Sequence, residues 1–298
     1  METELSAAKA PPASVCLDDV SKPSRPKPAK TFRERAYDVA MAILRPITKL
    51  IERTSLIPTT PFLGGVTFPW VARAEAAWPD VRRELDQVLT WRDDLPAFHE
   101  INGDATDLRN DDWKTFLFCG FGLWSAANCR RCPKTAALLE SIPGAKTAFF
   151  SILLPGARLP PHKGAWKGVI RYHLALMVPQ PEEQCGIQVD GQIAHWREGG
   201  SLLFDDTYEH AAWNDTKGTR VVLFVDVVRP CRFPGSLVNR AVIAIAALTP
   251  FIRSSLRRQR AWERRFGAKH GDLAAAGPAA PMAARSVGDA GAPSVEPR

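Results

Sequence analysis

The sequence lacks any run of roughly 18 apolar residues, the length that a membrane-spanning helix needs. Its first residues also lack the charged, apolar and small-residue pattern of a signal peptide. We therefore expect neither a transmembrane helix nor secretion, and we expect the chain to be cytoplasmic.

Cysteine is scarce, with six residues scattered along 298 positions. Without an export signal, this distribution argues against a disulfide framework. Cys129 and Cys132 form one CxxC motif, but a structural zinc site needs a second pair of ligands. We interpret the two residues as free structural thiols.

Apolar periodicity is missing from both ends of the chain. Residues 1–31 combine Pro, Lys and Ser, and residues 268–298 are rich in Ala, Gly and Pro. Such compositions are typical of disordered tails. The hydrophobic content of 45% suits one sizeable globular domain with extensions.

Most residues that could carry chemistry lie between Ser151 and Asp226, including four of the six histidines. Strand alternation places Arg171 and His173 on one face of an otherwise apolar segment, and it places Arg220 on one face of the next. Burying a guanidinium is costly unless an anion accompanies it. Arg is suited to binding a carboxylate through two hydrogen bonds, so the pattern predicts an acidic partner.

Several motifs in this block resemble those of a known enzyme family. They are PHKG at 161–164, RYHLAL at 171–176, WREG at 196–199, FDDTYEHAAWND at 204–215 and RVVLFVDVVRP at 220–230. Together they resemble the aspartyl/asparaginyl β-hydroxylase family of iron(II)- and 2-oxoglutarate-dependent dioxygenases, over about 113–230. The resemblance implies a mostly β fold, a double-stranded β-helix of the jelly-roll or cupin-like kind, with flanking helices.

The resemblance also assigns roles to individual residues. His162 and His210 match the iron ligands, and Arg220 joins them in the expected catalytic set. The general facial triad of such enzymes has a carboxylate at the position of Gly164. This family lacks it, so water would replace the third protein ligand, and O2 is the second cosubstrate. The residues that match the 2-oxoglutarate site are Ser151, Arg171, His173 and Arg220.

Other polar residues near the motifs allow more than one interpretation. Asp205 or Asp206 could orient the imidazole of His210, or could be a turn residue. Asp206 could also replace the missing carboxylate ligand, although the family pattern does not support this. Lys163 could meet an acidic group on a substrate, but a solvated lysine is the simpler interpretation. We interpret the three remaining histidines as structural residues: His99, His195 and His270.

Basic helices are predicted on both sides of the catalytic block. Residues 32–53 alternate apolar and basic side chains at helical spacing, with a kink predicted at Pro46. That helix either packs on the domain or lies on an anionic membrane surface. The predicted organisation is a disordered tail at 1–31, a helical extension at 32–90, the double-stranded β-helix domain at 91–235, basic C-terminal helices at 236–267 and a second disordered tail at 268–298.

The substrate is the least determined part of the prediction. The segments that flank the block resemble those of bacterial lipid hydroxylases, which favours an acyl chain of lipid A or an ornithine lipid and a peripheral location on the inner face of the membrane. Gly164 instead favours the aspartyl enzymes and β-hydroxylation of Asp or Asn. A non-catalytic interaction protein is a third hypothesis. No nucleic-acid motif accompanies the basic helices, so we expect no nucleic-acid partner.

Overall fold

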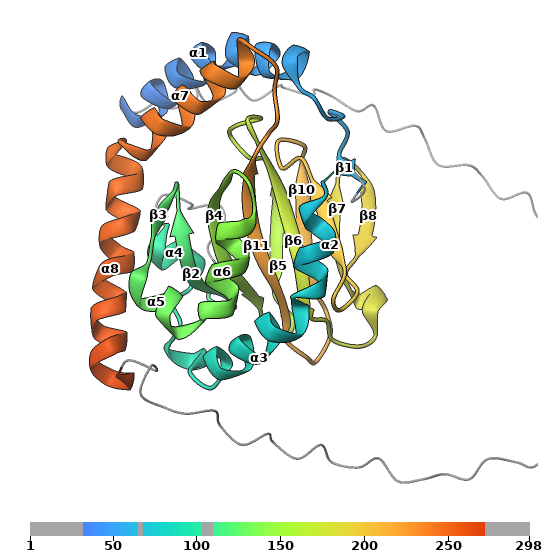
Figure 1. Ribbon diagram of the computed structural model, residues 1–298, viewed down its shortest axis with the longest axis vertical. Coiled ribbons are helices and arrows are strands. Elements are labelled where there is room, and N and C mark those ends of the chain that lie inside the picture. The colour runs from blue at the N-terminus through green and yellow to red at the C-terminus, as the bar shows by residue number, and fades with distance from the viewer. Residues whose placement is uncertain (1–31, 65–67, 103–109, 272–298) are drawn as a thin grey trace, which may run out of the picture. The chain divides into compact units, whose positions relative to one another are not determined.

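Two antiparallel β-sheets form the centre of the computed structural model, which describes residues 32–64, 68–102 and 110–271 (Figure 1). The chain divides into two compact units, Met1–Ala42 and Ile43–Arg298, and both sheets belong to the second. One sheet has seven strands in the order β1-β9-β6-β11-β4-β2-β3, and the other has four in the order β5-β10-β7-β8. This arrangement confirms the predicted double-stranded β-helix with flanking helices.

The strand boundaries follow the alternating segments of the sequence. In the larger sheet they are β1 (Phe62–Leu63), β2 (Trp113–Gly120), β3 (Leu123–Trp124), β4 (Ala145–Leu153), β6 (Val169–Met177), β9 (Ser201–Phe204) and β11 (Arg220–Val228). In the smaller sheet they are β5 (Arg158–His162), β7 (Cys185–Val189), β8 (Gln192–His195) and β10 (His210–Asn214).

The helices lie before, between and after these strands. They are α1 (Phe32–Thr54), α2 (Trp70–Ala76), α3 (Trp78–Leu89), α4 (Phe98–Ile101), α5 (Ala126–Arg131), α6 (Pro133–Ser141), α7 (Gly235–Ala247) and α8 (Pro250–His270). Short 3-10 helices span Arg92–Asp94 and Glu182–Gln184.

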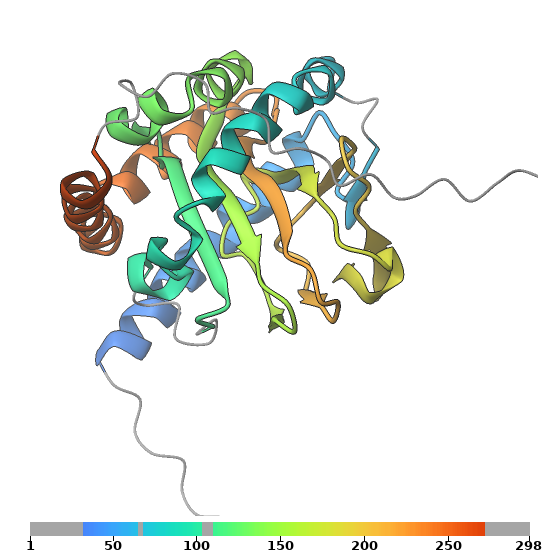
Figure 2. The same ribbon diagram turned by 90° about the horizontal axis from the view of Figure 1, so that it is seen from below.

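Both faces of the larger sheet are buried. On its outer face, Tyr172 and Leu174 of β6 pack in one cluster with Leu85 of α3 and Leu139 of α6. Figure 2 shows these helices on one side of the sheet. Each fully buried side chain of this size contributes roughly 1.5–3 kcal/mol to folding. The inner face packs against the smaller sheet, and the site residues are found there.

Three features refine the predicted segments outside the strands. Within the helical extension, residues 70–89 form two helices that meet at Ala77, and α1 includes Pro46. The extension also contributes β1, which pairs with β9 at the edge of the sheet. α8 continues to His270, beyond the predicted start of the second tail. The tails at 1–31 and 272–298 lie outside the described residues.

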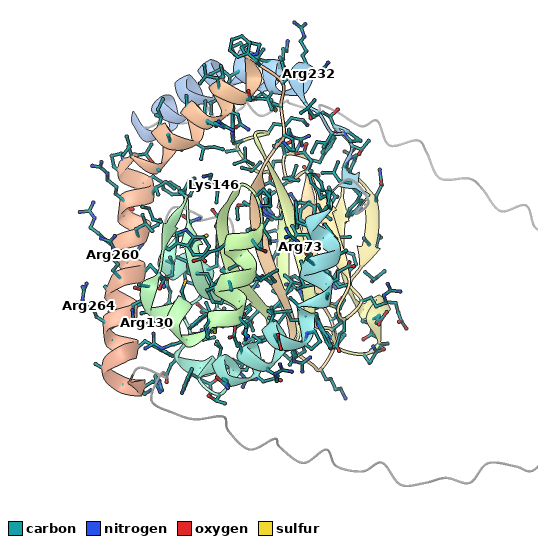
Figure 3. The ribbon with its side chains drawn as sticks, in the orientation of Figure 1. Arg73, Arg130, Lys146, Arg232, Arg260 and Arg264 are labelled. Carbon is teal, nitrogen blue, oxygen red and sulfur yellow. The ribbon has the colours of Figure 1, made fainter. Side chains whose placement is uncertain are left out.

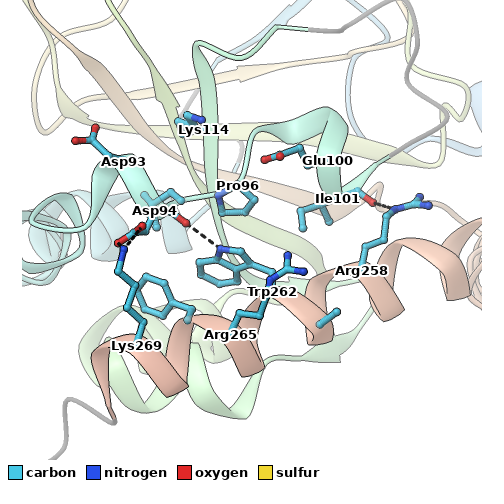
Figure 4. A pocket seen from close by; sticks show the side chains of 13 residues that line it. Asp93, Asp94, Pro96, Glu100, Ile101, Lys114, Arg258, Trp262, Arg265 and Lys269 are labelled. Carbon is cyan, nitrogen blue, oxygen red and sulfur yellow. Dashed lines mark hydrogen bonds and ion pairs between the residues drawn. The ribbon is translucent and has the colours of Figure 1, made fainter.

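Helix α8 is held to the domain by polar contacts at its C-terminal end. The indole Nε1 of Trp262 donates to the carbonyl oxygen of Asp94 at 3.0 Å, and Lys269 Nζ lies 2.6 Å from the Asp94 carboxylate. Earlier in the helix, Arg258 donates to the carbonyl oxygen of Ile101 at 2.9 Å. These residues surround a cavity of about 730 Å³ that mixes acidic and basic side chains (Figure 4).

No single helix among the described ranges is both long and apolar enough to cross a membrane. Helices α7 and α8 meet that requirement of length and composition only as a pair, which is bent by 56°.

Candidate active site

A pair of histidines faces each other across the smaller sheet. His162 ends β5, His210 begins β10, and the two are directly opposite in the antiparallel register. Their ring centroids are 4.1 Å apart. Nδ1 of His162 lies 2.9 Å from the carbonyl oxygen of Pro160, and Nδ1 of His210 lies 3.0 Å from that of Tyr208. Because a carbonyl oxygen only accepts, each Nδ1 carries the proton and each Nε2 presents a lone pair.

Both rings are neutral at physiological pH. Burial, reinforced by the charge of Arg171 and by His162, lowers the pKa of His210 to about 3. Burial also lowers the pKa of His162. Nε2 of His210 is buried and has no partner among the described residues. Neutral imidazole nitrogens of this kind are suitable ligands for iron(II).

The two histidines would need non-protein ligands to complete a metal site. Within residues 32–64, 68–102 and 110–271, no group of three His, Cys, Asp or Glu side chains could hold a metal ion. The donor set therefore fits a metal that takes its remaining ligands from a small molecule and water, as predicted from Gly164.

A carboxylate nevertheless lies beside Gly164. A Cβ atom at this position would overlap the carboxylate of Asp206, which follows β9. The Gly164 amide donates to the carbonyl oxygen of Asp206 at 2.7 Å. Burial raises the pKa of Asp206 to about 6, although Arg171 opposes the shift. Carbonyl oxygens rather than aspartates orient the two imidazoles. Asp206 instead fills the space that a side chain at position 164 would take.

Arg171 has its acidic partners within the protein. Its guanidinium lies 2.8 Å from Asp206 Oδ2 and donates to Asp226 Oδ1 at 3.0 Å. Asp226 is directly opposite Arg171 in the pairing of β11 with β6. The guanidinium also covers the ring of Phe224 at 4.3 Å from its centroid. The anion predicted on this face is thus at least partly supplied by two aspartates.

Arg220 lies in different surroundings. It is 2% exposed, and its Nη1 is 3.3 Å from the carbonyl oxygen and 3.4 Å from Oγ of Ser151. Its guanidinium carbon lies 4.5 Å from the ring centroid of Trp196, and its Nε has no partner in the described part of the chain. Burial lowers the pKa of Arg220 to about 10. A buried guanidinium beside a hydroxyl and an indole is a suitable site for an anionic ligand.

His173 and Ser151 complete this part of the inner face. Neither ring nitrogen of His173 has a partner among the described residues, and burial together with Arg220 holds its pKa well below the usual value. Its ring lies against aromatic side chains, including Phe224 at 5.4 Å. Ser151 Oγ accepts a hydrogen bond from Trp113 Nε1 at 2.9 Å. These groups can donate to or accept from a bound ligand next to Arg220.

The structure thus groups the predicted residues into two sets. Ser151, His173 and Arg220 lie together, whereas Arg171 belongs with two aspartates. Sequence reasoning did not assign roles to three residues that contact these sets: Trp113, Trp196 and Asp226. Trp196 was recognisable from its motif, and Asp226 from its inner-face position on β11.

The remaining polar candidates have structural contacts. Nδ1 of His195 lies 3.0 Å from the carbonyl oxygen of Cys185, and Nε2 of His270 lies 2.8 Å from Asp94. Nε2 of His99 is 3.5 Å from Asp111. Asp205 is fully buried with Arg229 and Lys167, and Lys163 is exposed.

The cysteines are free thiols wherever the structure describes them. Burial raises the pKa of Cys129 to about 11 and that of Cys132 well above its usual range. The CxxC motif is therefore protonated, as expected for structural thiols.

Comparison with known proteins gives the same family. The family profile described as aspartyl/asparaginyl beta-hydroxylase matches residues 75–230. The ornithine lipid ester-linked acyl 2-hydroxylase of Rhizobium tropici is 47% identical over 210 residues, which cover 70% of this chain and 75% of that protein.

Other relatives share the central region only. The human aspartyl/asparaginyl beta-hydroxylase is 30% identical over 176 residues, covering 54% of this chain and 23% of that protein. A cupin 2 conserved barrel domain protein from Salinispora arenicola is similar at a TM-score of 0.27 and 12% identity, covering 46% of this chain and 92% of that one. At that TM-score it adds nothing to the fold described above. From the profile match and the relative from Rhizobium tropici, we conclude that the chain belongs to the aspartyl/asparaginyl beta-hydroxylase family of hydroxylases.

Proposed function

We propose that this chain is an iron(II)- and 2-oxoglutarate-dependent dioxygenase that hydroxylates an acyl chain of a membrane lipid. The observation that supports this most is the histidine pair, in which Nε2 of His210 has no partner among the described residues, together with the buried Arg220, which has no carboxylate partner there. A metal and a dianionic cosubstrate would satisfy both.

Each residue has a defined task in this proposal. His162 and His210 would hold the iron, and Arg220 with Ser151 would bind the distal carboxylate of 2-oxoglutarate. His173, kept neutral by burial and by Arg220, would line the same pocket without adding charge. When bound, iron with 2-oxoglutarate and O2 supplies the oxidising chemistry that replaces C–H with C–OH and gives succinate and CO2.

The protein's own residues would position the ligands, supply charge and keep water out of the site. The aromatic rings of Phe204, Phe224 and Trp196 surround His173 and exclude water from the inner face. Asp206, held beside Gly164 by Arg171, is placed to accept a hydrogen bond from a ligand between the histidines and the sheet. The proposed hydroxylation needs no general base, so the neutrality of both histidines is compatible with it.

The test of the metal assignment is direct. His162→Ala and His210→Ala should each abolish iron(II)-dependent conversion of 2-oxoglutarate to succinate and weaken iron binding measured by calorimetry. His195→Ala is the matched control, because that histidine bonds backbone carbonyls through Nδ1, packs against Trp213 and is not one of the proposed ligands. Full iron binding and turnover in either site variant would refute the assignment.

The lipid substrate is proposed on two grounds. The relative from Rhizobium tropici is named an ornithine lipid ester-linked acyl 2-hydroxylase, and the match covers three quarters of that protein's length. The basic helices that follow the hydroxylase core are also suited to an anionic membrane surface. β-Hydroxylation of Asp or Asn is the alternative, which is the activity that the name of the human relative gives.

Lipid mass spectrometry of cells with and without the gene should show one added oxygen on an acyl chain of an ornithine lipid or lipid A. Hydroxylation of offered Asp or Asn peptides with no lipid change would favour the alternative.

We also infer peripheral association with an anionic membrane surface. Arg253, Arg257, Arg260 and Arg264 recur at helical spacing along α8 and are exposed. Figure 3 shows Arg260 and Arg264 pointing away from the helix. Each basic residue near an anionic membrane contributes on the order of 1 kcal/mol. For the predicted helix at 32–53, side chains are described mainly from Leu44 onward, and Arg45, Lys49 and Arg53 are exposed there.

A further inference from the structure

Two adjacent apolar cavities lie between the inner face of the larger sheet and helices α7 and α8. One has a volume of about 430 Å³ and the other about 230 Å³. The first alone is within the range of roughly 300–1,000 Å³ typical of small-molecule sites. The residues that line both are Phe121, Thr147, Arg171, Asp226, Phe251 and Ile252.

The lining is mostly apolar. Val242, Ile243 and Ala246 of α7 contribute to the wall of the larger cavity. At one end, Arg171 pairs with both Asp206 and Asp226, and Lys146 is a further charged residue of the wall. A peptide would bring backbone polar groups against the apolar wall, where each unpaired group is costly to bury. A hydrocarbon chain brings none.

The charged end connects the cavities to the histidine pair. Asp206 lines the larger cavity and also fills the space beside Gly164, which is two residues from His162. Arg171 lines both cavities and lies 2.8 Å from the same Asp206 carboxylate. A chain in the cavities would therefore end next to the proposed metal site.

Helix α7 is fixed above the cavities and exposes its other face. Asn239 donates to the carbonyl oxygen of Gly168 at 2.8 Å and accepts from Trp166 Nε1 at 3.0 Å, which anchors the helix. The opposite face carries apolar side chains that are more than half exposed: Phe233, at 78%, just before the helix, Leu237 at 61% and Ile245 at 65% within it, and Leu248 at 62% just after it. One helix thus has an apolar outer face and contributes to an apolar cavity beneath it.

We propose that the cavities under α7 and α8 bind the hydrocarbon chain of the substrate and that the outer face of α7 contacts the bilayer from which the chain enters. This inference rests on the proposed lipid hydroxylase function and adds the residues that select chain length. Each methylene moved from water into the cavity strengthens binding by a factor of about four. A cavity that is partly filled should therefore discriminate strongly against long chains.

The test compares a substitution in the cavity wall with one on another helix. Ala246→Trp fills the larger cavity, whereas Ala72→Trp adds the same side chain at an exposed position of α2. Ala246→Leu is a milder version that guards against misfolding, and circular dichroism checks all three variants. The activity probes are ornithine lipids with an ester-linked decanoyl or stearoyl chain in mixed micelles. Binding is measured separately with cis-parinaric acid, a fluorescent fatty acid, on metal-free protein.

The expected result is selective loss in the cavity variants. Ala246→Trp should lower turnover of the stearoyl lipid and affinity for parinaric acid by about tenfold or more, equivalent to excluding two methylenes. It should retain turnover of the decanoyl lipid, and Ala72→Trp should match the wild type. If the wild type hydroxylates both lipids and Ala246→Trp behaves identically, the cavity assignment is wrong while the proposed function stands. If the wild type modifies neither lipid but hydroxylates an Asp or Asn peptide, the proposed substrate is wrong and this inference fails with it.

Discussion

Arg171 and Arg220 are both on the inner face of the sheet, but their charges are balanced differently. Arg171 contacts two aspartates, while Arg220 contacts Ser151 and the ring of Trp196. A buried cation without a carboxylate is unfavourable unless a ligand provides one. In the proposed function, Arg220 would therefore be the residue through which an anionic cosubstrate gains most of its electrostatic stabilisation.

Arg220→Ala should raise the KM for 2-oxoglutarate sharply. Removing one partner of a buried charge pair costs about 2–5 kcal/mol, which corresponds to a factor of roughly thirty to several thousand. Arg220→Lys should restore only part of the affinity for 2-oxoglutarate, because a lysine cannot make two parallel hydrogen bonds to one carboxylate. Steady-state measurements of succinate formation test this, with Arg158→Ala as the control, since Arg158 is exposed and paired with Asp215. An unchanged KM in Arg220→Ala would mean that another group binds the distal carboxylate.

Gly164 and Asp206 should be coupled energetically. Gly164→Ala places a Cβ atom against the Asp206 carboxylate, and overpacking of this kind destabilises by about 1–3 kcal/mol. Asp206→Ala should relieve the overlap, so the double variant should be less destabilised than the sum of the two single changes. Urea unfolding measures all four proteins, and Gly267→Ala is the control because its Cβ would meet only one atom at 3.7 Å. Strict additivity would contradict the coupling.

At the scale of elements, the sequence predicted which side chains share a face but not their partners. Period-two alternation correctly placed Arg171 and His173 on one face of β6, and Tyr172 and Leu174 on the other. The pairing of Arg171 with Asp226 depends on the register of β6 against β11, which alternation does not determine. The position of Asp206 beside Gly164 depends on the loop after β9, and no periodic pattern describes a loop.

The exposed arginines of α8 give a prediction for membrane association. Arg260→Glu with Arg264→Glu should weaken co-sedimentation with vesicles of anionic phospholipid, and wild-type binding should fall as salt rises. Arg197→Glu with Lys217→Glu is the control, since it makes the same double charge reversal at exposed positions outside α8. Equal binding of the α8 variant and the control would place the membrane contact elsewhere.

At the scale of the whole molecule, the family core and the two C-terminal helices differ in how far they could be predicted. The match to the family ends at residue 230, and α7 and α8 follow it. Their basic and apolar composition, within a net charge of +7, was readable from the sequence. The cavities under them were not, because an enclosed space depends on how side chains far apart in the chain pack against one another.

The position of His162 on β5 has a consequence for the motions of the folded protein. β5 is an edge strand of its sheet and, among the described strands, pairs only with β10, so it can fray more easily than a strand paired on both sides. A metal bound by both histidines would cross-link these two strands at one end of the pair. Amide hydrogen exchange in β5 should therefore slow when iron(II) is added, while exchange in β6, paired on both sides, should change little. Mass spectrometry of exchange with and without metal measures the difference, and His210→Ala should erase it. The availability of iron(II) would then determine how long β5 stays paired with β10, before any substrate binds.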